Sequence, residues 1–130
     1  MIAPELVLEF AKLESDVAAS RGDFALFALF LREDVPDRWD LIVSAPWVLN
    51  EKAELSYLVD KIKSVLGPNA LTKLSRIVFG NPTDPAVEGL NKAIQVEHGT
   101  VEVKDSNFFG LAVKHAFIIT SKRPKVSVPG

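Results

Sequence analysis

The sequence predicts an α/β fold: a single domain with one five-stranded mixed β-sheet and three helices, in αββαβαββ order. Three observations support this prediction. The chain has 130 residues, the usual size of one domain. Short apolar runs alternate with longer segments whose apolar residues recur at helical spacing, and the eight prolines fall between these segments. We expect residues 1–122 to form the domain and residues 123–130 a C-terminal tail.

The first half of the chain predicts two helices around a pair of strands. An apolar stripe at helical spacing indicates a helix over residues 4–20. Residues 24–31 contain no polar side chain, which suits a central strand covered on both faces and favours helices on both sides of the sheet. Residues 39–45 follow as a second strand after a loop short enough for an antiparallel hairpin. Asn50 then caps a helix that extends to about residue 66.

The second half of the chain predicts three further strands and one helix. Residues 76–79 are a short buried strand, and residues 85–95 are the third helix. Residues 100–104 alternate polar with apolar side chains, as a strand with one wet face does. A loop is expected from Asp105, and residues 111–121 return as a long apolar strand. The helices between strands imply two right-handed crossovers and three parallel strands.

The composition excludes several classes of function. There are no cysteines, so disulfides, thiolate zinc sites, iron–sulfur clusters and cysteine nucleophiles are excluded. Lys and Arg number 15 against 17 Asp and Glu, a net charge of -2, which disfavours nucleic acid as a partner. The N-terminus does not resemble a signal peptide, and the longest apolar run is too short to span a bilayer. We therefore expect a cytoplasmic protein without a membrane segment.

One rim of the predicted sheet collects the residues best suited to a binding site. Ligands of open α/β sheets bind outside the carboxyl ends of the parallel strands. On the predicted topology, loops from four segments meet there, including the turn between the last two strands. Each of their residues also has a structural explanation, as a strand end, a cover of the core, or a turn and helix cap. The candidate residues for binding a small polar ligand are Ser44, Trp47, Asn81, Asp84, Asn107 and Phe108.

A second set of residues suggests metal-dependent chemistry. Pro36-Asp37 followed by Glu102-Val103-Lys104 resembles the signature of the restriction-endonuclease-like fold. That resemblance implies a hydrolase or nuclease in which Asp37 or Asp40 holds Mg²⁺ with Glu102 while Lys104 steadies the attacking water. On the predicted topology, however, Asp37 lies at the rim opposite Lys104. No other catalytic or cofactor-binding motif is present, so the sequence identifies no cofactor.

The function expected from these observations is a small non-enzymatic interaction or ligand-binding module, homodimeric or an accessory subunit of another chain. Lys114 and His115 interrupt the last apolar strand, and we expect a cross-strand Glu102–Lys114 pair. The exposed flank of that strand is the expected dimer surface. A small-molecule-binding domain with a pocket at the rim is the first alternative, and the metal-dependent hydrolase is the second.

Overall fold

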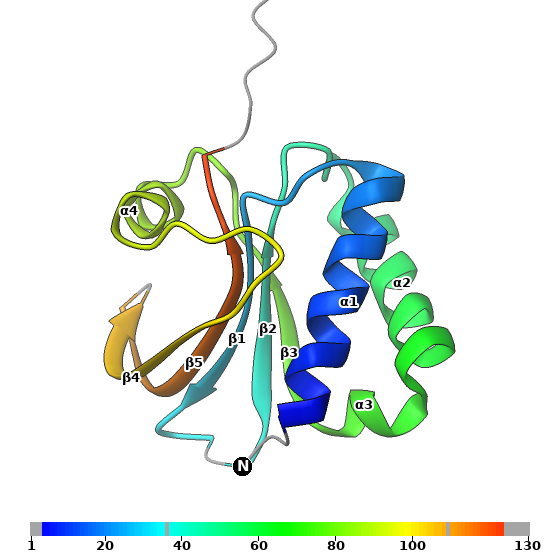
Figure 1. The fold of residues 1–130 in the computed structure, drawn as a ribbon, viewed down its shortest axis with the longest axis horizontal. Helices are drawn as coiled ribbons and strands as arrows, with labels where there is room; N and C mark the ends of the chain where they lie inside the picture. The colour runs from blue at the N-terminus through cyan, green and yellow to red at the C-terminus, as the bar shows by residue number, and fades with distance from the viewer. Residues whose placement is uncertain (1–3, 36, 109, 124–130) are drawn as a thin grey trace, which may run out of the picture.

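The computed structural model describes residues 4–35, 37–108 and 110–123, so Pro36 and most of the expected tail lie outside the described residues. Within them the fold is a single five-stranded mixed sheet with four α-helices and one π-helical segment (Figure 1). The predicted order is confirmed, and the short α3 is an addition to it. The elements are α1 (Pro4–Arg21), β1 (Leu26–Arg32), β2 (Trp39–Ser44), α2 (Glu51–Lys61), the π-helical η1 (Ile62–Leu66), α3 (Pro68–Thr72), β3 (Leu74–Phe79), α4 (Pro85–Ala93), β4 (Val101–Phe108) and β5 (Leu111–Ser121).

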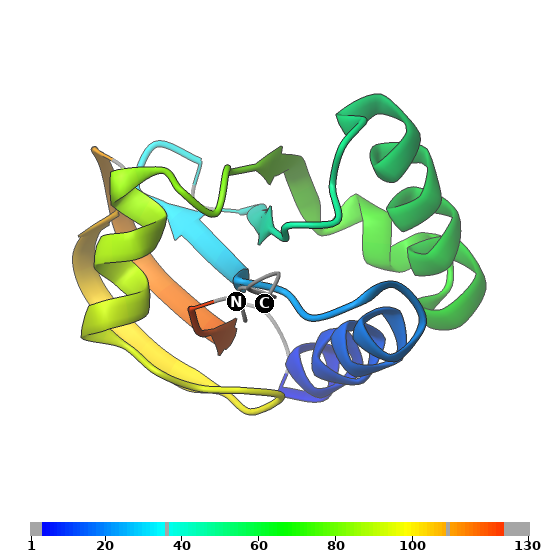
Figure 2. The same cartoon turned by 90° about the horizontal axis from the view of Figure 1, so that it is seen from above.

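The strand order across the sheet is β3-β2-β1-β5-β4, and only the β2–β3 pair is parallel. The prediction of three parallel strands is therefore wrong: β4 runs opposite to β3. The nine residues of α4 are about 14 Å long, and they run across the strands instead of back along them (Figure 2). The chain thus enters β4 at the end of the sheet where it left β3. The loop expected from Asp105 is also wrong, because β4 pairs with β5 as far as Phe108.

The two ends of the sheet carry different loops. We call the end where β2, β3 and β5 finish the α4 end, because α4 lies there. The other end, where β1 and β4 finish, is the hairpin end. Lys122, which follows β5, bonds to Asp23 before β1, so the segments flanking these two strands meet at the α4 end.

The sheet is covered on both faces, as the apolar first strand predicted. Side chains of β1 alternate between two separate hydrophobic clusters. Phe27 and Leu29 pack beneath α1, α2 and α3, whereas Ala28 and Phe30 face the side of α4. Every residue from Ala25 to Phe30 is fully buried. Strand β1 is therefore the centre of both cores.

The predicted helix caps are also confirmed. The Asn50 side chain accepts a hydrogen bond from the Ala53 N–H at 3.1 Å and begins α2. Asp84 accepts one from the Ala86 N–H at 2.9 Å and begins α4, with Pro85 in the first turn. These two caps fix the residues at which α2 and α4 begin.

The burial of β1 predicts that a leucine-to-alanine substitution there lowers the free energy of unfolding much more than the same substitution on the surface. Leu29→Ala, at a fully buried position of β1, should lower the free energy of unfolding by about 2–5 kcal/mol because it leaves a cavity. Leu8→Ala, on the exposed side of α1, should change it by less than about 0.5 kcal/mol. Urea denaturation of both variants measures this, and equal effects at the two sites would contradict the described packing.

Candidate functional site

The structure separates the six candidate rim residues into two groups. Ser44 ends β2, Trp47 comes after it, and Asn81 and Asp84 follow β3, all at the α4 end as predicted. Asn107 and Phe108 lie at the hairpin end, so their predicted place on the same rim is wrong. The cause is the reversed direction of β4, which turns the final hairpin away from the other loops.

The candidates at the α4 end have structural partners. The Trp47 indole N–H donates to the Gly22 carbonyl at 2.9 Å, and its ring lies against the α-carbon of this glycine, whose φ of +123° disfavours any side chain. Asn81 accepts hydrogen bonds from the Thr83 N–H and hydroxyl, which closes a turn before the Asp84 cap. These contacts account for three of the four side chains as parts of the scaffold.

Ser44 and the half-buried Phe108 also pack against other parts of the scaffold. Ser44 is fully buried, and its hydroxyl has no hydrogen-bond partner among the described residues. Phe108 stacks on Phe30 with ring centroids 5.0 Å apart and closes the core at the hairpin end. Neither side chain faces the cavities described below, and Asn107 is exposed beside Phe108.

The residues of the predicted metal-dependent site do not come together. Asp40, opposite Phe30, faces the α4 side of the sheet. Glu102 lies in β4, with two strands between it and β2, and it bonds to His115 on the opposite face of the sheet. Asp37 is exposed at the hairpin end, in the loop between β1 and β2, and Lys104 is exposed in β4. In the described part of the chain, no three His, Cys, Asp or Glu side chains could hold a metal ion.

The expected Glu102–Lys114 pair is likewise wrong. Lys114 is the extra residue of an irregularity in the β1–β5 pairing, and it is exposed. Glu102 instead lies 2.5 Å from His115 Nε2. Because β5 pairs with β1 on one side and β4 on the other, it offers no free edge along the flank expected as a dimer surface.

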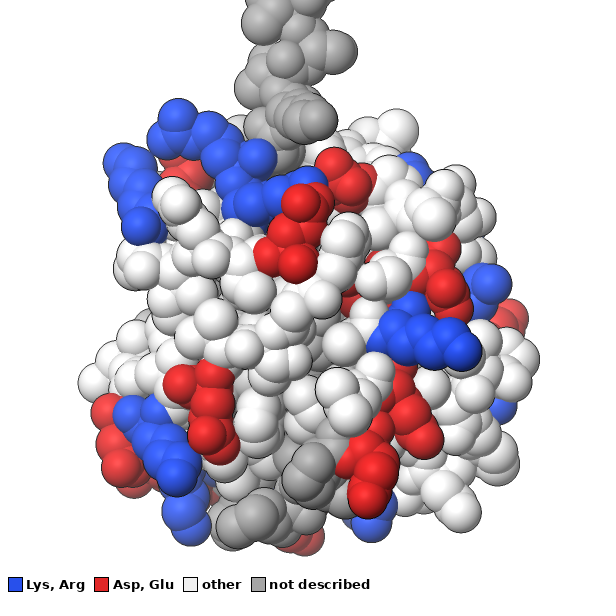
Figure 3. Space-filling model, viewed as in Figure 1, with Lys and Arg blue, Asp and Glu red and all other residues white. Residues whose placement is uncertain are grey.

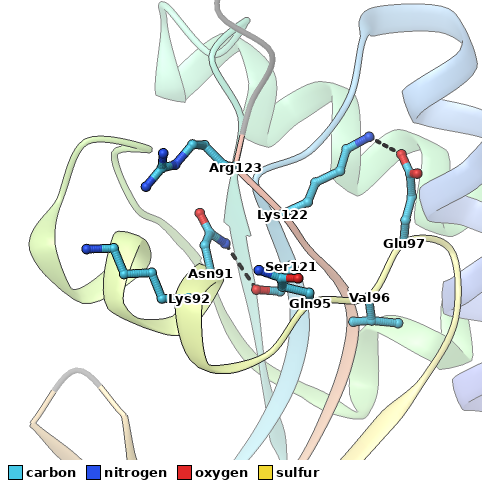
Figure 4. Close-up of a pocket in the computed structure, with 8 residues that line it drawn as sticks. All are labelled: Asn91, Lys92, Gln95, Val96, Glu97, Ser121, Lys122 and Arg123. Carbon is cyan, nitrogen blue, oxygen red and sulfur yellow. Dashed lines mark hydrogen bonds and ion pairs between the residues drawn. The ribbon is translucent and has the colours of Figure 1, made fainter.

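A cavity lies at the α4 end, between the last turn of α4 and the end of β5 (Figure 4). Its volume is about 370 Å³, within the range of small-molecule sites. Three cationic side chains line it together with one carboxylate and three polar groups. The lining residues are Asn91, Lys92, Gln95, Val96, Glu97, Ser121, Lys122 and Arg123.

The floor of this cavity is a buried hydrogen-bond network. The Asn91 amide N–H₂ donates to the Ala25 carbonyl at 2.9 Å and to the Ser121 hydroxyl at 3.0 Å. These bonds fix α4 to the sheet through a side chain that is only 6% exposed. The Asn91 amide oxygen points away from Ser121, toward the side where Arg123 lies (Figure 4). The floor therefore offers a rigid acceptor.

The walls of the cavity are rich in positive charge. Lys and Arg side chains gather over α4 and the end of β5, with acidic side chains beside them (Figure 3). Lys122 bonds to Glu97 and, at 3.0 Å, to Asp23. Burial alone would lower the pKa of Lys122, but these two bonds outweigh it and raise the pKa above its ordinary value. Lys92 and Arg123 are exposed and make no ion pair within the described residues.

A buried acid holds the loop beside this cavity. Glu14 of α1 is fully buried, and its Oε1 lies 2.5 Å from Nδ1 of His98. The His98 N–H donates to the Thr120 hydroxyl at 3.0 Å, and the backbone of His98 has a φ of +52°. Nε2 of the same ring lies 3.8 Å from Glu97, the partner of Lys122. The loop between α4 and β4 is thus fixed both to α1 and to the cavity wall.

Burial raises the pKa of Glu14 above its ordinary value, and the hydrogen bond and charge of His98 only partly offset this. The Thr120 hydroxyl also lowers the pKa, but Oε2 of Glu14 makes no hydrogen bond of normal geometry among the described residues. Ionisation of this side chain is therefore disfavoured in the folded protein.

The predicted topology does not bring the residues of this cavity together, because it reverses the directions of β4 and β5. The start of β4 and the end of β5, with Glu97, Lys122 and Arg123, would then lie at the rim opposite the Asp84 cap. The sequence does contain one signal of this site. Asn91 is a polar residue on the apolar face of the third predicted helix, among Val87, Leu90 and Ile94. A buried amide in such a helix needs hydrogen-bond partners.

The chain matches no protein-family model, no curated protein and no solved structure. Among the residues that the structure describes, no helix has the length and apolar character needed to cross a membrane.

The raised pKa of Glu14 predicts a specific dependence of stability on pH. The folded state holds this proton more tightly than the unfolded state, so the stabilisation is complete below the ordinary pKa of 4.5. It is lost as the pH rises through the higher folded value. The stability of the wild type should therefore fall relative to Glu14→Gln as the pH is raised from below 4.5, measured by urea denaturation.

A direct control is the titration of the Glu14 carboxyl carbon by NMR, which should give a pKa above 4.5. A value at or below 4.5, or a stability difference that is constant with pH, would contradict the described burial.

Proposed function

We propose that this protein is a ligand-binding module that takes a small anionic molecule into the cavity between α4 and the end of β5. The observation that carries the proposal is that Lys92, Lys122 and Arg123 all line one cavity of about 370 Å³ with a buried polar floor. Carboxylate and phosphate groups are the natural partners of such side chains.

The charge balance of the cavity supports an anionic ligand. Asp23 and Glu97 already bond to Lys122, whereas Lys92 and Arg123 keep their donors for solvent or a ligand. An anion between these two cations would make charge-assisted hydrogen bonds, which are stronger than neutral ones. The Asn91 oxygen on the floor would accept a hydrogen bond from a hydroxyl or amino group of the same ligand.

The rigidity of the surroundings also supports binding. The Asn91 bonds to Ala25 and Ser121 fix one wall, and the Glu14–His98 contact fixes the loop that carries Glu97. A preformed site loses little conformational entropy when a ligand binds. The structure thus combines a fixed floor with cations at the mouth.

The test is a thermal-shift screen of phosphate, small carboxylates, hydroxy acids and nucleoside monophosphates, followed by calorimetry of each compound that stabilises the protein. A ligand at 100 times its Kd adds about 2.7 kcal/mol of stability, which raises the melting temperature by several degrees. Lys92→Gln with Arg123→Gln should weaken binding at least tenfold, because each charge-assisted hydrogen bond contributes about 1.5–3 kcal/mol.

The matched control is Lys52→Gln with Lys63→Gln, which removes the same charge from exposed positions of α2 and η1. This variant should bind as the wild type does. Equal weakening by both double variants would show that binding depends on net charge alone. That result, or the absence of any stabilising anion, would contradict the proposal.

A further inference from the structure

A second, smaller cavity lies on the α4 face of the sheet beside the edge strand β3. Its volume is about 170 Å³, and its walls are mainly apolar. Arg76 and Val78 share one face of β3, and Leu111 reaches the cavity from the start of β5 because the final hairpin curls toward the α4 side (Figure 1). The lining residues are Ile42, Arg76, Val78, Phe79, Gly80, Asp84 and Leu111.

A buried carboxylate positions the arginine of this cavity. Asp40 is 1% exposed, and its Oδ2 accepts hydrogen bonds from Nε of Arg32 at 2.7 Å and from Nε of Arg76 at 3.1 Å. The contact with Asp40 holds the guanidinium of Arg76 against the sheet. Arg76 is nevertheless 45% exposed in its side chain.

The contact leaves most donors of Arg76 available. A guanidinium has five N–H groups, and Asp40 takes only the one on Nε. Within the described residues the two Nη groups of Arg76 make no hydrogen bond or ion pair, whereas Nη1 of Arg32 is bonded to Asp34. The Nη pair of Arg76 is therefore the donor set able to bind a carboxylate through two parallel hydrogen bonds.

We infer that this cavity is a second binding site, for a small monocarboxylate with a compact apolar body. The carboxylate binds the Nη pair of Arg76, and the apolar body packs against Ile42, Val78 and Leu111. Residues two apart on a strand are separated by about 6.6 Å. The distance along β3 from Arg76 to Val78 is therefore about the length of one aromatic ring. The site is separate from the cavity of the proposed function.

The far end of the cavity selects against a second negative charge. Asp84 lies there, beyond Gly80, where its Oδ1 also caps α4. A dicarboxylate would bring an anion toward this side chain, whereas a monocarboxylate presents only its apolar end. The opposite charges of Arg76 and Asp84 thus orient the ligand along β3.

The experiment titrates isotope-labelled protein with benzoate, and with benzamide as the neutral compound of the same shape, by two-dimensional amide NMR. Benzoate should cause saturable shifts at the amides of Ile42, Val78, Gly80 and Leu111, and benzamide should not. Arg76→Gln should weaken benzoate binding at least tenfold, while Arg38→Gln, in the exposed loop between β1 and β2, should leave it unchanged.

A second variant keeps the test decisive if loss of Arg76 disturbs the fold around Asp40. Val78→Phe fills the cavity while keeping the arginine and should also abolish the benzoate shifts. Binding that survives both variants, or no saturable shift at these amides, would overturn the inference. Shifts at Asn91 and Lys122 instead would overturn it too, while supporting the anion site at the α4 end.

Discussion

Strand β1 is apolar on both faces and fully buried from Leu26 to Phe30, and the arrangement of the helices follows from this. A strand without a polar face must be covered by a layer on each side. α1, α2 and α3 form one layer over Phe27 and Leu29, and α4 contributes the other over the opposite side chains. Only α4 covers the second face, and residues of α4 or of its Asp84 cap line both cavities.

The position of α4 also determines the chemistry at that end. Because α4 runs across the strands, its last turn meets the end of β5, and the chain continues through Val96 into a loop beside α1. Asn91 joins the helix to the sheet, and His98 joins the loop to Glu14. The cations that follow β5 are thereby placed against a rigid wall. Their proximity to α4 depends on long-range packing and not on spacing along the chain.

The sequence predicted the strands, the longer helices, the Asn50 and Asp84 caps and the two-layer cover, because each depends on local pattern or on one apolar run. It could not predict the direction of β4. The right-handed crossover rule suggested a parallel strand, but the rule applies when a helix returns along the sheet, and α4 does not. The same error placed Asn107 and Phe108 beside Ser44, whereas the structure puts them at the opposite end of the sheet. The partner of Glu102 was missed because the β4–β5 register pairs Glu102 with Phe117, which puts His115 and not Lys114 on the same face as Glu102. From the sequence Glu14 is expected to be solvent-exposed on its helix, and only the packing of α1 against the sheet near Thr120 buries it.

The central claim is that the cavity between α4 and β5 binds small anions. Amide NMR of the labelled protein during a titration with phosphate tests it most directly, since it reports every backbone position at once. The account predicts saturable shifts confined to the segments from Asn91 to Glu97 and from Ser121 to Arg123, and their loss at high salt. Shifts scattered over the exposed lysines, or none that saturate, would contradict it.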